Sequence, residues 1–223
     1  MKKNIARLQF ITSPADQNSY QQQVESYVMG GGNWVQLRMK EESVEEIEAQ
    51  ARRIFAYCME HGAAFILNDH VEIAARLGAD GVHLGKNDMR PAEARELLGP
   101  TAIIGGTANT FEDVQRLVSQ GVDYIGLGPY RFTSTKKNLS PVLGLEGYQA
   151  ILKACDEAGI TIPIVAIGGL VPDDFKGLFD AGCHGVALSS YITINEQPGA
   201  VTLELLEQIG RYTSVGWKRI FKK

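Results

Sequence analysis

A short sequence motif recurs three times along this chain, as Gly78-Ala-Asp-Gly-Val82, Gly121-Val-Asp-Tyr-Ile125 and Gly182-Cys-His-Gly-Val186. Each copy follows an amphipathic stretch and opens an apolar one. Glycine is favoured just past the end of a helix, and a short apolar run bounded by such a signal is typical of a buried strand. The motif therefore marks helix-to-strand junctions, and its recurrence indicates a chain of alternating strands and helices.

The same alternation extends over all 223 residues and predicts eight strand–helix pairs. The expected strands are Arg7–Ile11, Trp34–Leu37, Ala64–Leu67, Gly81–Leu84, Ala102–Gly105, Tyr124–Leu127, Pro163–Ile167 and Gly185–Leu188. The expected helices are Ser19–Met29, Val44–Glu60, Val71–Leu77, Pro91–Leu98, Phe111–Ser119, Leu145–Ala158, Pro172–Asp180 and Val201–Tyr212. Eight pairs favour a closed parallel barrel over an open sheet, so we predict an α/β protein, a single-domain (β/α)8 TIM barrel over residues 1–223.

Boundary signals accompany these helices. Ser43 and Asp69 stand where an N-cap is expected, and Pro91 and Pro172 suit a first helical turn. Glycines suited to helix ends are Gly62, Gly78, Gly121, Gly159 and Gly182. The basic tail, residues 213–223, is expected to form a terminal helix packed on the barrel, with contact to a partner or an anion as the alternative.

Composition excludes several classes of protein. The formal net charge is −4, which gives no sign of nucleic-acid binding, so an anionic ligand needs a local cationic pocket. Cys58, Cys155 and Cys183 form no Cys-x-x-Cys pair, which argues against a zinc site or disulfide framework and favours free thiols in a reducing cytoplasm. The sequence has neither a signal peptide nor a run of about 18 apolar residues, so we expect a cytoplasmic protein with no membrane partner. A homo-oligomer remains an alternative to a monomer.

The second strand ends in Gln36-Leu37-Arg38-Met39-Lys40. Strand alternation places Gln36, Arg38 and Lys40 on one face, and burying the two cations beneath helices would be costly, so that face points to the barrel mouth. Arginine offers a planar fork and lysine a compact charge, a combination that suits phosphate oxygens. The alternative is a solvated pair at a strand end.

Two acidic residues follow the next two strands. Asp69 comes after Asn68, and Asp88 lies in the loop after Leu84. Carboxylates from neighbouring strands, together with phosphate oxygens and water, form the usual environment of Mg²⁺, so we expect a magnesium cofactor here. The alternative for Asp69 is a helix N-cap.

Two further segments of the mouth suit anions. The sixth loop, Gly126–Asn138, carries Thr133, Thr135, Lys136 and Lys137 and is long enough to fold over a ligand, although an ordinary surface loop is the alternative. After the seventh and eighth strands stand Gly168-Gly169 and Ser189-Ser190, where barrels often bind a phosphate monoester. The mouth therefore offers one site suited to a pyrophosphate and a second suited to a monophosphate.

Five motifs stand in order along nearly the whole chain: Gln36-x-Arg38-x-Lys40, Asn68-Asp69, Gly81-Val-His-Leu-Gly85 followed by Asp88, Gly128-Pro129 followed by Thr133-x-Thr135-Lys136, and Gly168-Gly169. Together they resemble the thiamine-phosphate synthase family. The resemblance implies that a hydroxymethylpyrimidine pyrophosphate is joined to a thiazole phosphate, with release of pyrophosphate. No protein nucleophile or general base is required for this reaction, because departure of pyrophosphate leaves a pyrimidine cation that the thiazole nitrogen captures.

The resemblance also implies roles for the residues. Arg38, Lys40 and Lys136 would act in catalysis with Asn68 on the pyrophosphate, Asp69 and Asp88 would hold Mg²⁺, and Gln36 would lie beside the pyrimidine. The remaining substrate-binding residues would be Thr107, Thr133, Thr135, Gly168, Gly169, Ser189 and Ser190.

The chain departs from the family pattern at three positions. Thr107 replaces the usual serine, Asn109 replaces the usual histidine, and Phe132 stands where a proline is common. A thiazole tautomerase, a non-catalytic binder of thiamine phosphates and another sugar-phosphate barrel remain as alternatives. A histidine at position 109 would favour the tautomerase, which needs no metal pair, and the Gln-x-Arg-x-Lys strand argues against the sugar-phosphate enzyme. Only turnover separates a binder from an enzyme.

Overall fold

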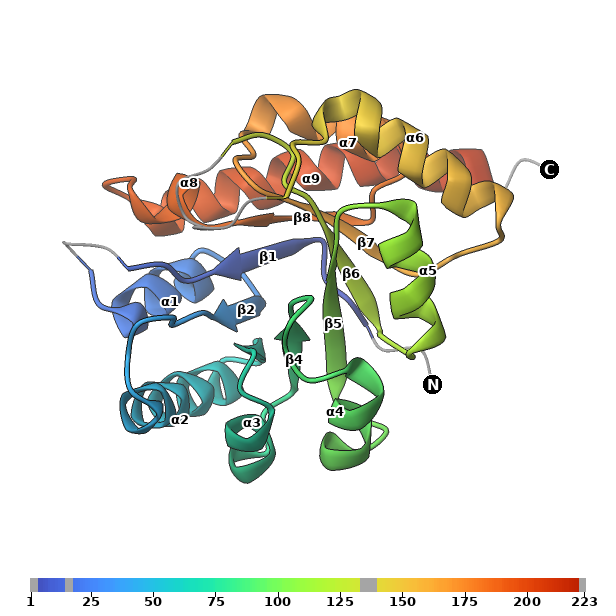
Figure 1. The fold of residues 1–223 in the computed structure, drawn as a ribbon. Coiled ribbons are helices and arrows are strands. Elements are labelled where there is room, and N and C mark those ends of the chain that lie inside the picture. The colour runs from blue at the N-terminus through green and yellow to red at the C-terminus, as the bar shows by residue number, and fades with distance from the viewer. Residues whose placement is uncertain (1–3, 15–17, 133–139, 221–223) are drawn as a thin grey trace.

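The computed structural model describes residues 4–14, 18–132 and 140–220. Eight parallel strands close into a barrel in chain order, from β1 to β8 and back to β1, which confirms the predicted (β/α)8 TIM barrel (Figure 1). The strands are β1 Leu8–Ile11, β2 Trp34–Leu37, β3 Ala64–Asn68, β4 Gly81–Leu84, β5 Ile103–Ala108, β6 Tyr124–Leu127, β7 Ile164–Ile167 and β8 Gly185–Leu188. Strand β5 is longer than predicted and includes Thr107.

Helices surround the strands, with α2, α3 and α4 along the lower side of Figure 1 and α6, α7 and α9 along the upper side. They are α1 Tyr20–Met29, α2 Val44–Glu60, α3 Val71–Leu77, α4 Pro91–Leu98, α5 Phe111–Ser119, α6 Gly144–Glu157, the 3-10 turn η1 Pro172–Asp174, α7 Phe175–Asp180, α8 Ser190–Thr193 and α9 Pro198–Ile220. The helix expected over Val201–Tyr212 thus continues to Ile220, and the short α8 was not predicted. In the described chain no helix is both long and apolar enough to cross a membrane.

Local signals explain most helix starts. Ser43 caps α2 through a full capping box with Glu46, and Pro91 occupies the first turn of α4, as predicted. The prediction that Asp69 caps a helix is wrong. His70 holds the N-cap position of α3 without a side-chain cap bond, and the carboxylate of Asp69 is used elsewhere.

The core has two layers, separated by the barrel wall. Outward residues of the strands, such as Phe10 and Leu37, pack against the helices. Inward residues form a second cluster inside the barrel that includes Trp34, Ile66 and Tyr124, each at most 1% exposed. The ring edge of Trp34 meets Tyr124 at a centroid distance of 4.8 Å, so large side chains fill the barrel interior.

The recurring sequence motif also contributes an aspartate to the structure in its first two copies. In the first copy Asp80 accepts the amide of Phe65 on β3 at 2.8 Å. In the second, Asp123 accepts the amide of Ile104 on β5 at 2.8 Å and pairs with Arg95 at 2.6 Å. Each carboxylate therefore ties the start of one strand to a neighbouring strand at the end of the barrel opposite the mouth.

This bonding predicts a stability cost at Asp123. Asp123→Ala leaves a strand amide without its acceptor and removes the anionic partner of a half-buried guanidinium, which keeps only carbonyl acceptors, so we expect the free energy of unfolding to fall by about 2–4 kcal/mol. Urea unfolding followed by circular dichroism measures it, with the exposed Asp156 of α6 as the matched position. Asp156→Ala should change the free energy by less than about 0.5 kcal/mol. Equal losses in the two variants would contradict the assigned role.

Candidate active site

The polar residues predicted for the mouth lie at the carboxyl ends of neighbouring strands. On β2 and the residues after it, Leu37 and Met39 are buried against the helices, which leaves Gln36, Arg38 and Lys40 on the other face as predicted. The hydroxyl oxygen of Thr12, just after β1, accepts a hydrogen bond from the backbone amide of Arg38 at 2.9 Å. The end of β1 thus fixes the backbone that carries the arginine.

Arg38 is half-buried in this setting. Burial lowers the pKa of its guanidinium, while the nearby Asp69 and Tyr20 act in the opposite direction. An arginine keeps its proton under any ordinary condition, so the mouth holds a partly desolvated positive charge. Such a charge attracts an anion more strongly than a solvated one does.

Asp69 has an unusual backbone for an aspartate, with φ at +66° in the left-handed region. Its amide donates to the carbonyl oxygen of His83 at 3.0 Å, and its carboxylate forms an ion pair with Lys40. This conformation turns the side chain away from the start of α3 and into the mouth. Left-handed backbone outside glycine concentrates at functional sites, where the surrounding structure holds it in place.

The carboxyl groups of Asp69 and Asp88 meet in a hydrogen bond. Burial, together with the contact to Asp88, raises the pKa of Asp69 to about 6. The pKa of Asp88 stays low, because its bonds to Asp69 and to the amide of Gly85 at 2.6 Å outweigh its burial. Two adjacent carboxylates therefore share a proton unless a cation neutralises them.

This pair has the donor chemistry that a small, hard divalent cation prefers. Among the described residues there is no cluster of three or more His, Cys, Asp or Glu suited to a metal. A cation held by Asp69 and Asp88 would therefore complete its shell with water and substrate oxygens. Magnesium commonly binds in that way, through one or two carboxylates and the phosphates of a substrate.

Two buried donors at the strand ends have no partner within the described residues. They are the side-chain nitrogen of Asn68, which is 7% exposed, and the hydroxyl of Ser189. An unsatisfied buried polar group is costly, and native proteins rarely keep one without a reason. Asn68 ends β3 and Ser189 follows β8, so both donors lie at the mouth, where ligand oxygens could accept from them.

The loop after β6 is anchored on both sides. Asn109 donates to the carbonyl oxygens of Gly128 and Pro141, each at 2.9 Å, and so joins the two ends of this loop. Arg131 binds Asp174 with two nitrogens, each at 2.7 Å, and also donates to the carbonyl oxygen of Gly169. Sequence reasoning singled out Asn109 only as a departure from the family pattern and did not find the Arg131–Asp174 pair.

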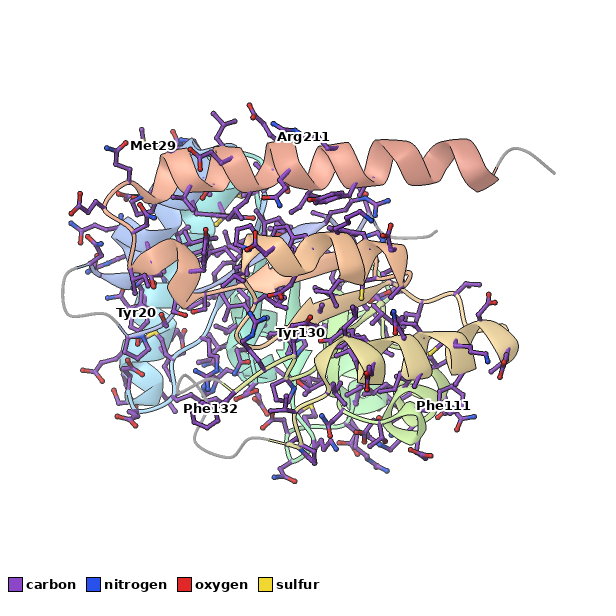
Figure 2. All side chains as sticks on the ribbon, turned by 90° about the horizontal axis from the view of Figure 1, so that it is seen from above. Tyr20, Met29, Phe111, Tyr130, Phe132 and Arg211 are labelled. Carbon is purple, nitrogen blue, oxygen red and sulfur yellow. The ribbon has the colours of Figure 1, made fainter. Side chains whose placement is uncertain are left out.

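Gly168 and Gly169 have φ values of +98° and +68°, which favour glycine. A Cβ on Gly168 would stand 2.6 Å from Pro129, and one on Gly169 would stand 2.5 Å from Arg131. The glycines were predicted for their close approach to a phosphate. They also let the loop after β6 lie directly on the end of β7. Tyr130 and Phe132 of this loop are labelled in Figure 2, and Phe132 is 75% exposed.

The other predicted site residues divide into two groups. Thr107 lies on the inner face of β5, and its hydroxyl is 3.0 Å from Nε2 of His83, while Ser190 is exposed at the start of α8. Thr133, Thr135 and Lys136 lie outside the described residues. His83 received no catalytic role from the sequence, yet it stands at the centre of the inner polar network.

A family profile described as thiamine monophosphate synthase matches residues 8–192. The chain belongs to this family. A thiamine-phosphate synthase of Bacteroides fragilis is 53% identical over 199 residues, covering 89% of this chain and 98% of the relative. One from Flavobacterium johnsoniae is 41% identical over 203 residues, covering 91% and 96%. The solved thiamine phosphate pyrophosphorylase of Pyrococcus furiosus superposes with a TM-score of 0.81 at 29% identity, over 92% of this chain and 96% of that one.

Membership of the thiamine monophosphate synthase family agrees with the geometry of the mouth. The matched segment contains all eight strands and every predicted site residue from Gln36 to Ser190. It also contains Asn109 and Phe132, so the departures at these positions occur within a complete family barrel.

The close contact at Gly169 makes a stability prediction. Gly169 and Gly62 share a φ of +68°, but a Cβ on Gly62 meets nothing within 4 Å. Both Gly→Ala variants incur the strain of left-handed backbone, about 1–2 kcal/mol, and Gly169→Ala adds the clash with Arg131. We expect Gly169→Ala to lose about 1–3 kcal/mol more than Gly62→Ala in urea unfolding. If the two variants lose the same free energy, the loop does not rest on β7.

Proposed function

We propose that this chain is a thiamine-phosphate synthase, a transferase that joins hydroxymethylpyrimidine pyrophosphate to thiazole phosphate and releases pyrophosphate. The observation that carries the proposal is the meeting of Arg38, Lys40, Asp69 and Asp88 at one barrel mouth, in a chain that belongs to this family. The substrates are small molecules, and each carries phosphate.

The pyrophosphate would lie against β2 and β3. Arg38 supplies a planar fork, Lys40 a mobile point charge and Asn68 a buried amide donor with no partner in the described chain. Lys40 is paired with Asp69 in the free protein, so an arriving anion with its cation would exchange that pair for a larger network. Lys136 remains a sequence-based assignment to the same group.

Mg²⁺ is the cofactor that we assign to Asp69 and Asp88. When bound, it would neutralise part of the charge that develops on the departing pyrophosphate. Burial and the contact with Asp88 raise the pKa of Asp69, and a bound cation would favour the ionised form of both carboxylates. The protein's own contribution is to hold the two carboxylates side by side, one by left-handed backbone and one by the amide of Gly85.

The thiazole phosphate would bind at the ends of β7 and β8. The hydroxyl of Ser189 is buried and unpartnered in the described chain. Ser190 follows it in sequence, and Gly168 and Gly169 follow β7, the strand that pairs with β8. Thr133 and Thr135 are assigned to the same phosphate from the sequence. Backbone amides and hydroxyls suit a monophosphate that must stay in place while the neighbouring pyrophosphate leaves.

The chemistry needs stabilisation of charge and alignment of two rings rather than a protein nucleophile. Departure of pyrophosphate leaves a pyrimidine cation, and the thiazole nitrogen donates its electron pair to the exocyclic carbon. Gln36, His83 and Thr107 line the inner side of the mouth, where the pyrimidine would lie.

We further propose that the enzyme works in the cytoplasm. Three buried free thiols support a reducing compartment. A homo-oligomer remains a sequence-based expectation.

The direct test is formation of thiamine phosphate by the purified protein from both substrates, with Mg²⁺ and after removal of the metal by a chelator. We expect product only with the metal present. Absence of product with the thiazole phosphate bound would contradict the proposal, and isomerisation of that thiazole would then identify a tautomerase.

Two substitutions test the carboxylate pair. Asp69→Asn and Asp88→Asn keep the shape of each side chain and remove its charge, so we expect kcat/KM to fall by about 100-fold or more. Added Mg²⁺ should recover part of the activity of the variant that binds the metal more weakly. Asp156→Asn is the control, because that residue is exposed on α6. Turnover near the wild-type rate in Asp69→Asn would remove it from the metal site.

A further inference from the structure

Five polar side chains form a continuous hydrogen-bonded chain across the inside of the barrel. Gln36 on β2 donates to Gln9 on β1 at 3.2 Å, and Gln9 donates to the hydroxyl of Tyr124 on β6 at 3.1 Å. That hydroxyl lies 2.9 Å from Nδ1 of His83 on β4, and Nε2 of His83 lies 3.0 Å from the hydroxyl of Thr107 on β5. The chain begins and ends at side chains that we place beside the pyrimidine.

The middle of this chain is sealed from solvent. Gln9 is 1% exposed and Tyr124 is fully buried, with the edge of Trp34 packed against its ring. Burial raises the pKa of Tyr124, which keeps its phenol neutral. In such an interior each donor must meet an acceptor, because a mismatched pair would cost a buried hydrogen bond.

The order of donors along the chain follows from this matching. The Tyr124 oxygen receives a proton from the amide of Gln9, so its own single proton points to Nδ1 of His83. His83 then carries its proton on Nε2 and donates it to the oxygen of Thr107. Among the described residues, no acceptor faces the hydroxyl proton of Thr107, and no donor faces the side-chain carbonyl oxygen of Gln36. One end therefore offers an acceptor and the other a donor.

We propose that Gln9 and Tyr124 are positioning residues that set this proton order, and that the order makes the site prefer the aminopyrimidine of the proposed reaction over the corresponding oxopyrimidine. An aminopyrimidine presents an amino donor and an adjacent ring nitrogen acceptor. These complement the Gln36 carbonyl oxygen and the Thr107 hydroxyl. An oxopyrimidine presents a carbonyl acceptor and a ring N–H donor instead. Its carbonyl oxygen would then face the carbonyl oxygen of Gln36, and its N–H would face the donating hydroxyl of Thr107.

The reverse order is chemically self-consistent and gives the opposite preference. If both amides were turned over, His83 would carry its proton on Nδ1, Thr107 would donate to His83, and Gln36 would present its NH2 group. The two orders cannot mix within one chain, because Tyr124 has one hydroxyl proton. The tautomer of His83 therefore reports the polarity of the whole chain.

The first experiment measures this tautomer in the free protein by nitrogen-15 NMR, with the His83 signals assigned by their loss in His83→Gln. We expect a neutral ring protonated on Nε2 in the wild type. Tyr124→Phe removes the hydroxyl but keeps the ring, and should yield a mixture of tautomers. Ile66→Val changes packing in the same apolar cluster as Tyr124 but removes no hydrogen-bonding group, and should leave the tautomer unchanged. A ring protonated on Nδ1 in the wild type would overturn the proposal.

The second experiment measures binding of hydroxymethylpyrimidine with either a 4-amino or a 4-oxo group by calorimetry. We expect the wild type and Ile66→Val to bind the amino form at least about tenfold more tightly, and Tyr124→Phe to lose most of that preference. Gln9→Met serves as a second variant if Tyr124→Phe unfolds. An unchanged preference in a folded variant would overturn the proposal. The selectivity rests on the proposed function. If the wild type binds neither ring, that result counts against the proposed function. The tautomer of His83 still decides the proton order in that case.

Discussion

Strand alternation inside a closed barrel is the constraint on which the rest of this molecule depends. Every second residue of each strand points inward, and the small interior must be filled from one end to the other. Large apolar groups such as Trp34 and Ile66 occupy much of it, and polar residues follow toward the mouth. The alternation that buries Leu37 beneath the helices is the same alternation that presents Gln36, and after it Arg38 and Lys40, to a ligand.

This arrangement lets an acidic protein hold anions. The net charge is −4, yet the mouth holds the half-buried guanidinium of Arg38, whose field is strengthened by low exposure, beside the exposed ammonium of Lys40. The two carboxylates beside them balance that charge in the free protein through the Lys40–Asp69 pair. The site thus contains opposite charges whose pairing would change on binding of the proposed phosphate oxygens and cation. Donors without a partner in the described chain, at Asn68 and Ser189, belong to the same incomplete arrangement.

The sequence predicted the barrel and the phase of its second strand, because both depend on short-range periodicity. It did not decide the role of Asp69. An aspartate before a helix is most often a cap, and only the left-handed backbone shows that its carboxylate turns to Asp88. The Arg131–Asp174 pair and the Gln9–Tyr124 bond join residues 43 and 115 positions apart, so no local pattern could reveal them. The longer β5, which brings Thr107 to the inner wall, depends on pairing with β6 rather than on its own glycines.

We infer that one barrel mouth binds a pyrophosphate with its cation on one side and a monophosphate on the other. A crystal structure of the protein with Mn²⁺, pyrophosphate and thiazole phosphate tests it most directly, since the anomalous signal of manganese locates the metal. We expect a manganese peak between Asp69 and Asp88, pyrophosphate on Arg38 and Lys40, and the monophosphate beside Gly169 and Ser189. A metal bound away from the two carboxylates, or both phosphates bound at the same strand ends, would contradict it.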